Sequence, residues 1–362
     1  MLYKEDWEKT MERFDALWQC EVVDRCCVAV KAPKDRSTYN PEKYAKPDNH
    51  DELIKYFRDP ERVLERYTAE FEGTYYGGEA LPSIRPNWGE NGFTMYFRGA
   101  RYKYTRDTLW MFPMIQDWEK DRLEFEKDGD TLKKHLEFLK HLAGEAKGKC
   151  LLAMPDYMGG VDAFINVRGV EDTLMDMVDN PDELSKGLGA LREAFKYAGS
   201  RFYDIIKECN SGGSVIAWFN TWARGSSCLV QCDHSALLSP VMFERFSLPD
   251  LEECCNMLDF AAYHLDGDEQ VRHLDMLLSV KSIKLIQWTN VAGQPGVLNY
   301  IPVYKRIQKA GKALLLFCGM NEVETLLSEL SPRGLYLSVS GAGCEADARE
   351  VIKKAGKWTR NV

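Results

Sequence analysis

A histidine and an aspartate two residues apart, His264 and Asp266, follow a short apolar run at residues 258–263. A segment with helical spacing of apolar residues begins just after them and extends to residue 280. This order predicts a strand, then His-Leu-Asp-Gly, then a helix. Both side chains would then lie at the end of a strand and point into one cavity. An imidazole and a carboxylate can act there as acid and base, or as metal ligands.

A cysteine near the end of the sequence extends this pair. Cys344 lies in a Gly-rich turn that precedes a predicted helix, and the positive end of a helix dipole favours a thiolate. Zinc accepts nitrogen, oxygen and sulfur ligands, and an open catalytic site needs three protein ligands. His264, Asp266 and Cys344 are therefore candidate metal ligands. The alternative is an acid–base site without a metal.

Other polar and aromatic residues follow predicted strands. We expect Asp156 and Asp233 to act in catalysis beside His264 and Asp266. The residues expected to bind the substrate are Asp162, Arg168, Trp218, Trp222, Gln231 and Trp288. Each has a structural alternative, because a strand-end aspartate is commonly a helix N-cap and Trp288 can belong to the core.

The elements that must position these residues are clearest in residues 146–362, where short apolar runs alternate with helical segments. Predicted strands lie at 150–154, 214–219, 259–263, 284–288, 313–317 and 335–339, and residues 229–232 are assigned to a loop. Such alternation indicates parallel strands with right-handed crossovers. No G-x-G-x-x-G follows the first strand, which disfavours an open nucleotide-binding sheet. We therefore predict a (β/α)8 TIM barrel, with functional groups on the loops after its strands.

The two remaining barrel strands must come from residues 1–145, where strands and helices do not alternate regularly. One is predicted at 26–30, and the other lies within 74–120, a segment rich in Gly, Pro, Tyr and Trp. That segment also predicts a hairpin, with strands at 93–97 and 101–104, that caps one end of the barrel. The whole chain, 1–362, is thus predicted to be one barrel domain with an N-terminal helical and hairpin elaboration.

Composition narrows the classes of function. The 362 residues include 56 acidic and 47 basic side chains, giving a net charge of -9. General affinity for nucleic acid or anionic membranes needs clustered Lys and Arg, so both are disfavoured. No apolar run approaches the roughly 18 residues of a membrane span. The eleven cysteines form no CxxC pair, and no export signal is evident. We expect a cytoplasmic protein with reduced thiols and a small-molecule substrate.

Several segments resemble the uroporphyrinogen decarboxylase superfamily. They are Gln231-Cys-Asp-His-Ser-Ala-Leu-Leu-Ser-Pro240, Tyr263-His-Leu-Asp-Gly267, Gln287-Trp288, the final Gly-Ala-Gly-Cys344-Glu turn, and the stretches 156–162, 168–171 and 179–181. The likeness covers residues 150–356 well and the first 145 residues loosely. It implies a (β/α)8 barrel. It also implies a homodimer, because members of the family tend to form dimers.

The superfamily includes two chemistries. Its decarboxylases act on a tetrapyrrole without a cofactor and carry an Arg-Gln-Ala-Gly-Arg segment near the N-terminus, which residues 1–50 lack. Its methyltransferases use zinc to transfer a methyl group between a corrinoid protein and a thiol. Their zinc ligands are His-x-Cys and a distant Cys. His264 and Cys344 resemble the first and last of these ligands, and Asp266 stands in place of the middle one.

The resemblance therefore implies a zinc-dependent methyltransferase or demethylase for a small substrate. No Asp-x-His-x-x-Gly cobalamin motif is present, so the corrinoid (cobalamin) would be supplied by a partner protein. Two alternatives stay open. One is a metal-free decarboxylase or lyase for a tetrapyrrole or another small carboxylated substrate. The other is a non-enzymatic tetrapyrrole- or corrinoid-binding protein on the same fold.

Overall fold

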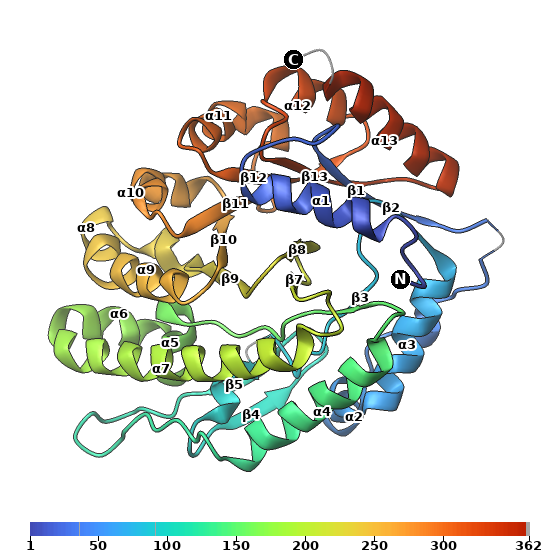
Figure 1. The fold of residues 1–362 in the computed structure, drawn as a ribbon. Helices are drawn as coiled ribbons and strands as arrows, with labels where there is room; N and C mark the ends of the chain where they lie inside the picture. The colour runs from blue at the N-terminus through green and yellow to red at the C-terminus, as the bar shows by residue number, and fades with distance from the viewer. Residues whose placement is uncertain (36, 91, 360–362) are drawn as a thin grey trace.

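A computed structural model describes residues 1–35, 37–90 and 92–359, and its centre is a sheet of seven strands (Figure 1). In spatial order the strands are β2 (Thr74–Gly78), β1 (Cys27–Pro33), β13 (Leu335–Ser340), β12 (Ala313–Gly319), β11 (Ile283–Thr289), β10 (Phe260–Asp266) and β9 (Ser227–Gln231). All neighbours are parallel except β2, which runs antiparallel to β1. The α/β class predicted from the sequence is confirmed.

The strands of this sheet are apolar along most of their length because both of their faces are covered. In β12, for example, the four residues 313–316 are completely buried. Each of the strands β10 to β13 is followed by a helical segment that packs outside the sheet (Figure 1). The main helices of this layer are α10 (Leu274–Ser279), α11 (Ile301–Lys309), α12 (Val323–Glu329) and α13 (Glu345–Thr359).

Three short two-stranded pieces accompany the main sheet. β3 (Ser83–Ile84) pairs in parallel with β6 (Leu151–Leu152), β7 (Ser214–Ile216) pairs with β8 (Thr221–Ala223), and β4 (Arg101–Tyr104) pairs with β5 (Leu109–Phe112). The backbone N–H of Met154 donates to the carbonyl of Val215 at 2.9 Å, so the β6 segment adjoins β7. The described strands thus form seven-stranded and two-stranded sheets rather than one continuous sheet of eight.

Three local predictions are wrong. Residues 229–232 were assigned to a loop, but 227–231 form β9 in the central sheet, because the loop after β7 is only a tight turn into β8. Asn220, with a φ of 51°, lies in that turn, which ends β7 before the predicted boundary at 219. Residues 92–96 form a short 3₁₀ helix instead of a strand, and the hairpin is β4–β5.

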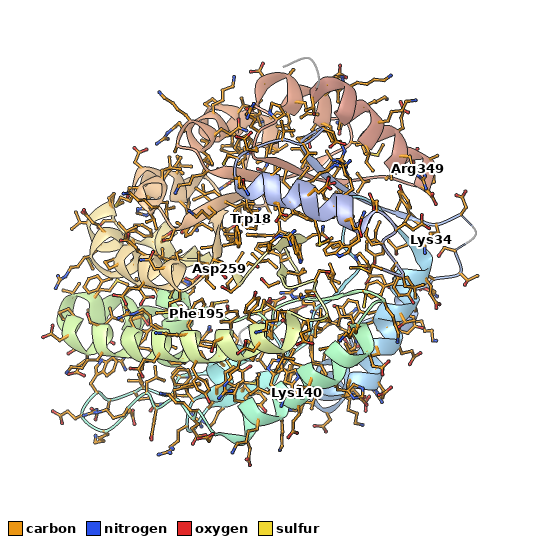
Figure 2. All side chains as sticks on the ribbon, viewed as in Figure 1. Trp18, Lys34, Lys140, Phe195, Asp259 and Arg349 are labelled. Atoms are coloured by element: carbon orange, nitrogen blue, oxygen red, sulfur yellow. The ribbon has the colours of Figure 1, made fainter. Side chains whose placement is uncertain are left out.

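The N-terminal helices are α1 (Trp7–Trp18), α2 (His50–Arg58), α3 (Pro60–Gly73) and α4 (Asp130–Ala146). α1 packs against β1 and β8, and Trp18, labelled in Figure 2 at the end of α1, has a buried side chain. The indole N–H of Trp18 donates to the carbonyl of Trp222 in β8 at 2.8 Å. No helix of the described residues has the length and apolar content to cross a bilayer.

A buried ion pair joins the first strands. Glu79, with no exposed surface, accepts hydrogen bonds from both terminal nitrogens of Arg25 at 2.6 and 2.9 Å. It also accepts from the backbone N–H of Val28 at 2.7 Å and from Arg13 at 3.1 Å. Because every donor here is directed at one carboxylate, the pair fixes how the β1–β2 edge sits against α1.

Candidate active site

Three potential metal ligands meet at the carboxyl ends of neighbouring strands. Asp233 follows β9, whereas His264 and Asp266 close β10, and the register pairs His264 with Gln231. One ligand atom from each residue lies within 4.8 Å of the other two. The Nε2 atom of His264 is 3.7 Å from an oxygen of Asp233 and 3.8 Å from an oxygen of Asp266. Adjacent parallel strands thus bring together residues 31 to 33 positions apart without help from a long loop.

Gln287 in β11 sets the orientation of the imidazole. Its side-chain oxygen accepts a hydrogen bond from Nδ1 of His264 at 2.6 Å, and its nitrogen donates to Thr289 at 2.8 Å. With the amide oxygen facing the histidine, Nδ1 carries the proton and Nε2 presents a lone pair. Burial lowers the pKa of His264, although Gln287 and Asp266 oppose that effect. A neutral imidazole therefore faces the two carboxylates.

Asp233 has the most unusual protonation in this group. Burial, followed by the charges of Asp162 and Asp266, raises its pKa to about 7. Gln231 donates to one carboxylate oxygen at 2.8 Å. The other oxygen is buried and, among the described residues, has no hydrogen-bond partner. An unsatisfied buried oxygen is costly, and a bound cation or a proton would compensate for it.

Asp162, predicted to bind the substrate, holds residues 231–234 in place through hydrogen bonds. It lies in α5 (Gly160–Arg168) and is buried. It accepts hydrogen bonds from the backbone N–H of Asp233 at 2.8 Å, from Nδ1 of His234 at 2.9 Å and from Gln231 at 3.2 Å. Burial acts to raise its pKa, but these bonds outweigh it and lower the pKa of Asp162. It therefore acts as an ionised anchor for the turn that carries Asp233.

A cavity of about 410 Å³ opens beside these residues. Of the predicted residues, its wall includes Asp156, Trp218, Gln231 and Asp233. The indole of Trp218 is 42% exposed and meets the His264 ring edge to face, with 4.6 Å between ring centres. One wall of the cavity is therefore an indole whose ring also contacts the imidazole of His264.

Three predicted substrate-binding residues, Arg168, Trp222 and Trp288, make contacts within the protein and lie away from the 410 Å³ cavity. Arg168 is held by Asp176, with a nitrogen–oxygen distance of 2.8 Å, and donates to two backbone carbonyls. Trp222 is fully buried against Trp7 of α1. Trp288 is also buried, and its indole N–H donates to a neighbouring asparagine at 2.6 Å. None of the three lines the 410 Å³ cavity, so their place is in the core.

Cys344 lies partly buried in the turn between β13 and α13. In the described part of the chain it is not in the cluster of ligand atoms, where Asp233 takes the third position. Its role as a ligand stays a prediction from the resemblance. Asp156, predicted to be catalytic, forms an ion pair with Arg85 at the wall of the cavity.

Sequence reasoning missed two contributors, Arg85 and Gln287. Arg85 follows the two-residue strand β3, which is too short to give a periodic signal. Gln287 carried a usable signal, because it is a polar residue in the middle of an apolar run and is completely buried. A buried amide needs a specific partner, and here that partner is His264.

One of three comparisons with known proteins, the search of solved structures, finds a similar protein. No family profile matches the chain, and no curated protein matches it by sequence. Among solved structures, a methyltransferase from Methanosarcina mazei matches with a TM-score of 0.60 over 96% of this chain and 98% of that chain. The two sequences are 13% identical. The chain therefore has the overall fold of that protein along nearly its whole length.

Proposed function

We propose that this protein is a metal-dependent methyltransferase of the uroporphyrinogen decarboxylase superfamily, acting with a corrinoid protein on a small substrate. The observation that carries the proposal is the grouping of Asp233, His264 and Asp266 beside an aromatic-walled cavity. The fold shared with a methyltransferase supports it. We also propose that β3 and β6 join the six parallel strands of the main sheet, β1 and β9 to β13, in a closed eight-stranded barrel, with β7 beside β6.

The residues present fit a divalent metal. His264 offers an unprotonated Nε2, and Asp233 offers a buried oxygen without a partner among the described residues. Zinc is the proposed ion because it accepts this mixture of imidazole and carboxylate. When bound, zinc would supply Lewis-acid activation of the thiol or hydroxyl group that accepts the methyl, or polarise a methoxy or amine donor.

The protein's own groups would bind and orient the substrate. Trp218 offers an exposed ring face that can hold a flat ring or a cationic methyl group and displace water. Gln231 keeps Asp233 directed at the centre of the group. Because its pKa is about 7, Asp233 can hold a proton on its carboxylate near neutral pH and release it when a cation arrives.

A metal-free decarboxylase or lyase is the second candidate. The pKa of Asp233, about 7, favours it, because a carboxyl group that titrates near neutral pH beside a neutral imidazole suits proton transfer. In this candidate Asp233 would be the acid and His264 the base. The two candidates differ in whether a cation is needed, which makes metal binding the deciding measurement.

The test is metal analysis of protein purified without a tag, followed by calorimetric zinc titration of the chelator-treated protein. We expect one site per chain, lost in H264A and weakened in D233N and D266N. The control is H141A, which removes a surface histidine on α4. Zinc bound by H264A as tightly as by the wild type would refute the proposed centre. Loss of zinc in C344S but not in D233N would instead restore the ligand set implied by the resemblance.

A second measurement addresses the methyl transfer itself. Methylcobalamin and a small thiol are mixed with zinc-loaded protein, and the visible spectrum reports demethylation of the corrin. We expect turnover that disappears in H264A and falls in a Trp218→Ala variant, which alters the cavity wall but none of the three ligands. Turnover equal to that of the buffer alone would count against a methyltransferase and leave the lyase candidate.

A further inference from the structure

Arg85 lies where several cavities of the protein meet. It follows β3, and it lines three adjoining cavities of about 410, 150 and 530 Å³. Its side chain is 34% exposed, and one terminal nitrogen pairs with Asp156. Its Nε is buried and has no hydrogen-bond partner among the described residues. The guanidinium thus lies between the 410 Å³ cavity and the 150 Å³ cavity.

The segment that carries Arg85 is held rigidly. Asn87 accepts a hydrogen bond from the backbone N–H of Asp156 at 2.7 Å. His135 of α4 bonds to the carbonyl of Pro86 at 3.0 Å and stacks on Trp88 with 4.3 Å between ring centres. Burial lowers the pKa of His135 to about 3, so this ring stays neutral. A cation placed by such a segment is positioned in advance of any ligand.

A second arginine meets the same small cavity from α3. Arg66 lies over the ring of Tyr56, 3.9 Å from its centre, and donates to the backbone carbonyl of that residue at 3.2 Å. Within the described part of the chain, no carboxylate oxygen pairs with its guanidinium at 4.0 Å or less. Arg66 is partly buried, and a partly buried cation without a counter-ion is unfavourable.

The rest of the wall is consistent with an anion as the missing partner. Asn87 carries a side-chain nitrogen that is buried and lacks a hydrogen-bond partner among the described residues. The charged residues at the exposed rim are mixed, with Lys46 against Glu90 and Asp107. The inner wall therefore has an excess of donors, from Arg66, Arg85 and Asn87, whereas the acids remain at the solvent edge.

We propose that the 150 Å³ cavity binds a carboxylate, held between Arg66 and Arg85. Guanidinium groups recognise carboxylates through paired hydrogen bonds, which matches two arginines facing one small space. The rest of the molecule would extend past Arg85 into the 410 Å³ cavity, toward Trp218 and His264. That this carboxylate belongs to the substrate of the methyl transfer rests on the proposed function; the anion site itself does not.

The test is calorimetric titration of the chelator-treated protein with phenylacetate, and with 2-phenylethanol as a neutral counterpart. We expect saturable binding of phenylacetate alone, weakened about tenfold or more in R66Q, the loss typical of removing a charge-assisted hydrogen bond. R66K, which retains the charge but not the paired geometry, should lie between R66Q and the wild type. The matched control is R62Q, on the same helix, whose guanidinium pairs with Glu52 at the surface.

The outcomes separate this site from the metal centre. Absence of saturable phenylacetate binding in the wild type, or equal affinity in R66Q and R62Q, would overturn the carboxylate site. Because the titration is done without metal, neither result depends on zinc. Zinc titration of R66Q should match the wild type, so failure of the metal centre would show itself in H264A and not here.

Discussion

Replacing Asp233 by asparagine should stabilise the chelator-treated protein at alkaline pH and leave it nearly unchanged at acidic pH. Burial, then the charges of Asp162 and Asp266, raises the pKa of Asp233 from its ordinary 3.8 to about 7. Below pH 3.8 both the folded and the unfolded states hold the proton. As the pH rises toward 7 only the unfolded state loses it, so the wild type loses stability progressively, and the cost is complete above the folded pKa.

The size of the effect follows from that range. Each pH unit between the two pKa values is worth about 1.36 kcal/mol, which gives at most about 2.7 kcal/mol between pH 5 and the folded pKa. The Asp233 side chain is 37% exposed, and solvent screening reduces this to about 1 kcal/mol.

Urea unfolding of wild type and D233N at about pH 5 and pH 8 measures the difference, with D179N, a substitution on the surface of α6 (Val170–Asp179), as the control. A stability gap between wild type and D233N that is the same at both pH values would refute the raised pKa.

Three further expectations concern the surroundings of the site. Gln287→Leu removes the acceptor that orients His264 and should weaken zinc binding by about 10- to 100-fold in calorimetry, whereas Gln287→Glu should retain it. Glu79→Ala leaves Arg25 buried without its partner and should lower the free energy of unfolding by about 3–5 kcal/mol, measured with urea. Trp222→Ala should cost about 3–5 kcal/mol in the same assay without changing the affinity for phenylacetate.

The repeating part of the fold could be predicted from sequence because its strands are buried on both faces. Short continuous apolar runs such as 313–317 and 335–339 are typical of strands that are buried on both faces, and both runs form strands in the interior of the sheet. β9 was missed because only three residues separate it from β8, so the stretch was taken as part of the loop after the strand at 214–219. The pieces β3 and β6 span two residues each, which is too short for any periodic pattern.

The site was predictable where position along a strand decides it. His264, Asp266 and Asp233 follow directly from strand ends, and the parallel register brings them together. Trp222 and Trp288, predicted to bind the substrate, are buried, and the sequence places a tryptophan near a strand end without indicating which face of the strand it occupies. The side on which a residue lies depends on the packing of α1 and α11, which single-sequence patterns do not resolve.

The cluster at His264 and the two-arginine cavity come from different parts of the chain. The cluster and the residues that orient it lie within 231–287, on neighbouring parallel strands of the main sheet. The small cavity is lined by residues within 46–109, which lie outside those strands. Insertions or substitutions within residues 46–109 would alter which molecules fit the small cavity without displacing the cluster at His264. The N-terminal third is thus where substitutions in descendants of this protein would change the ligand bound, while the cluster at His264 stays the same.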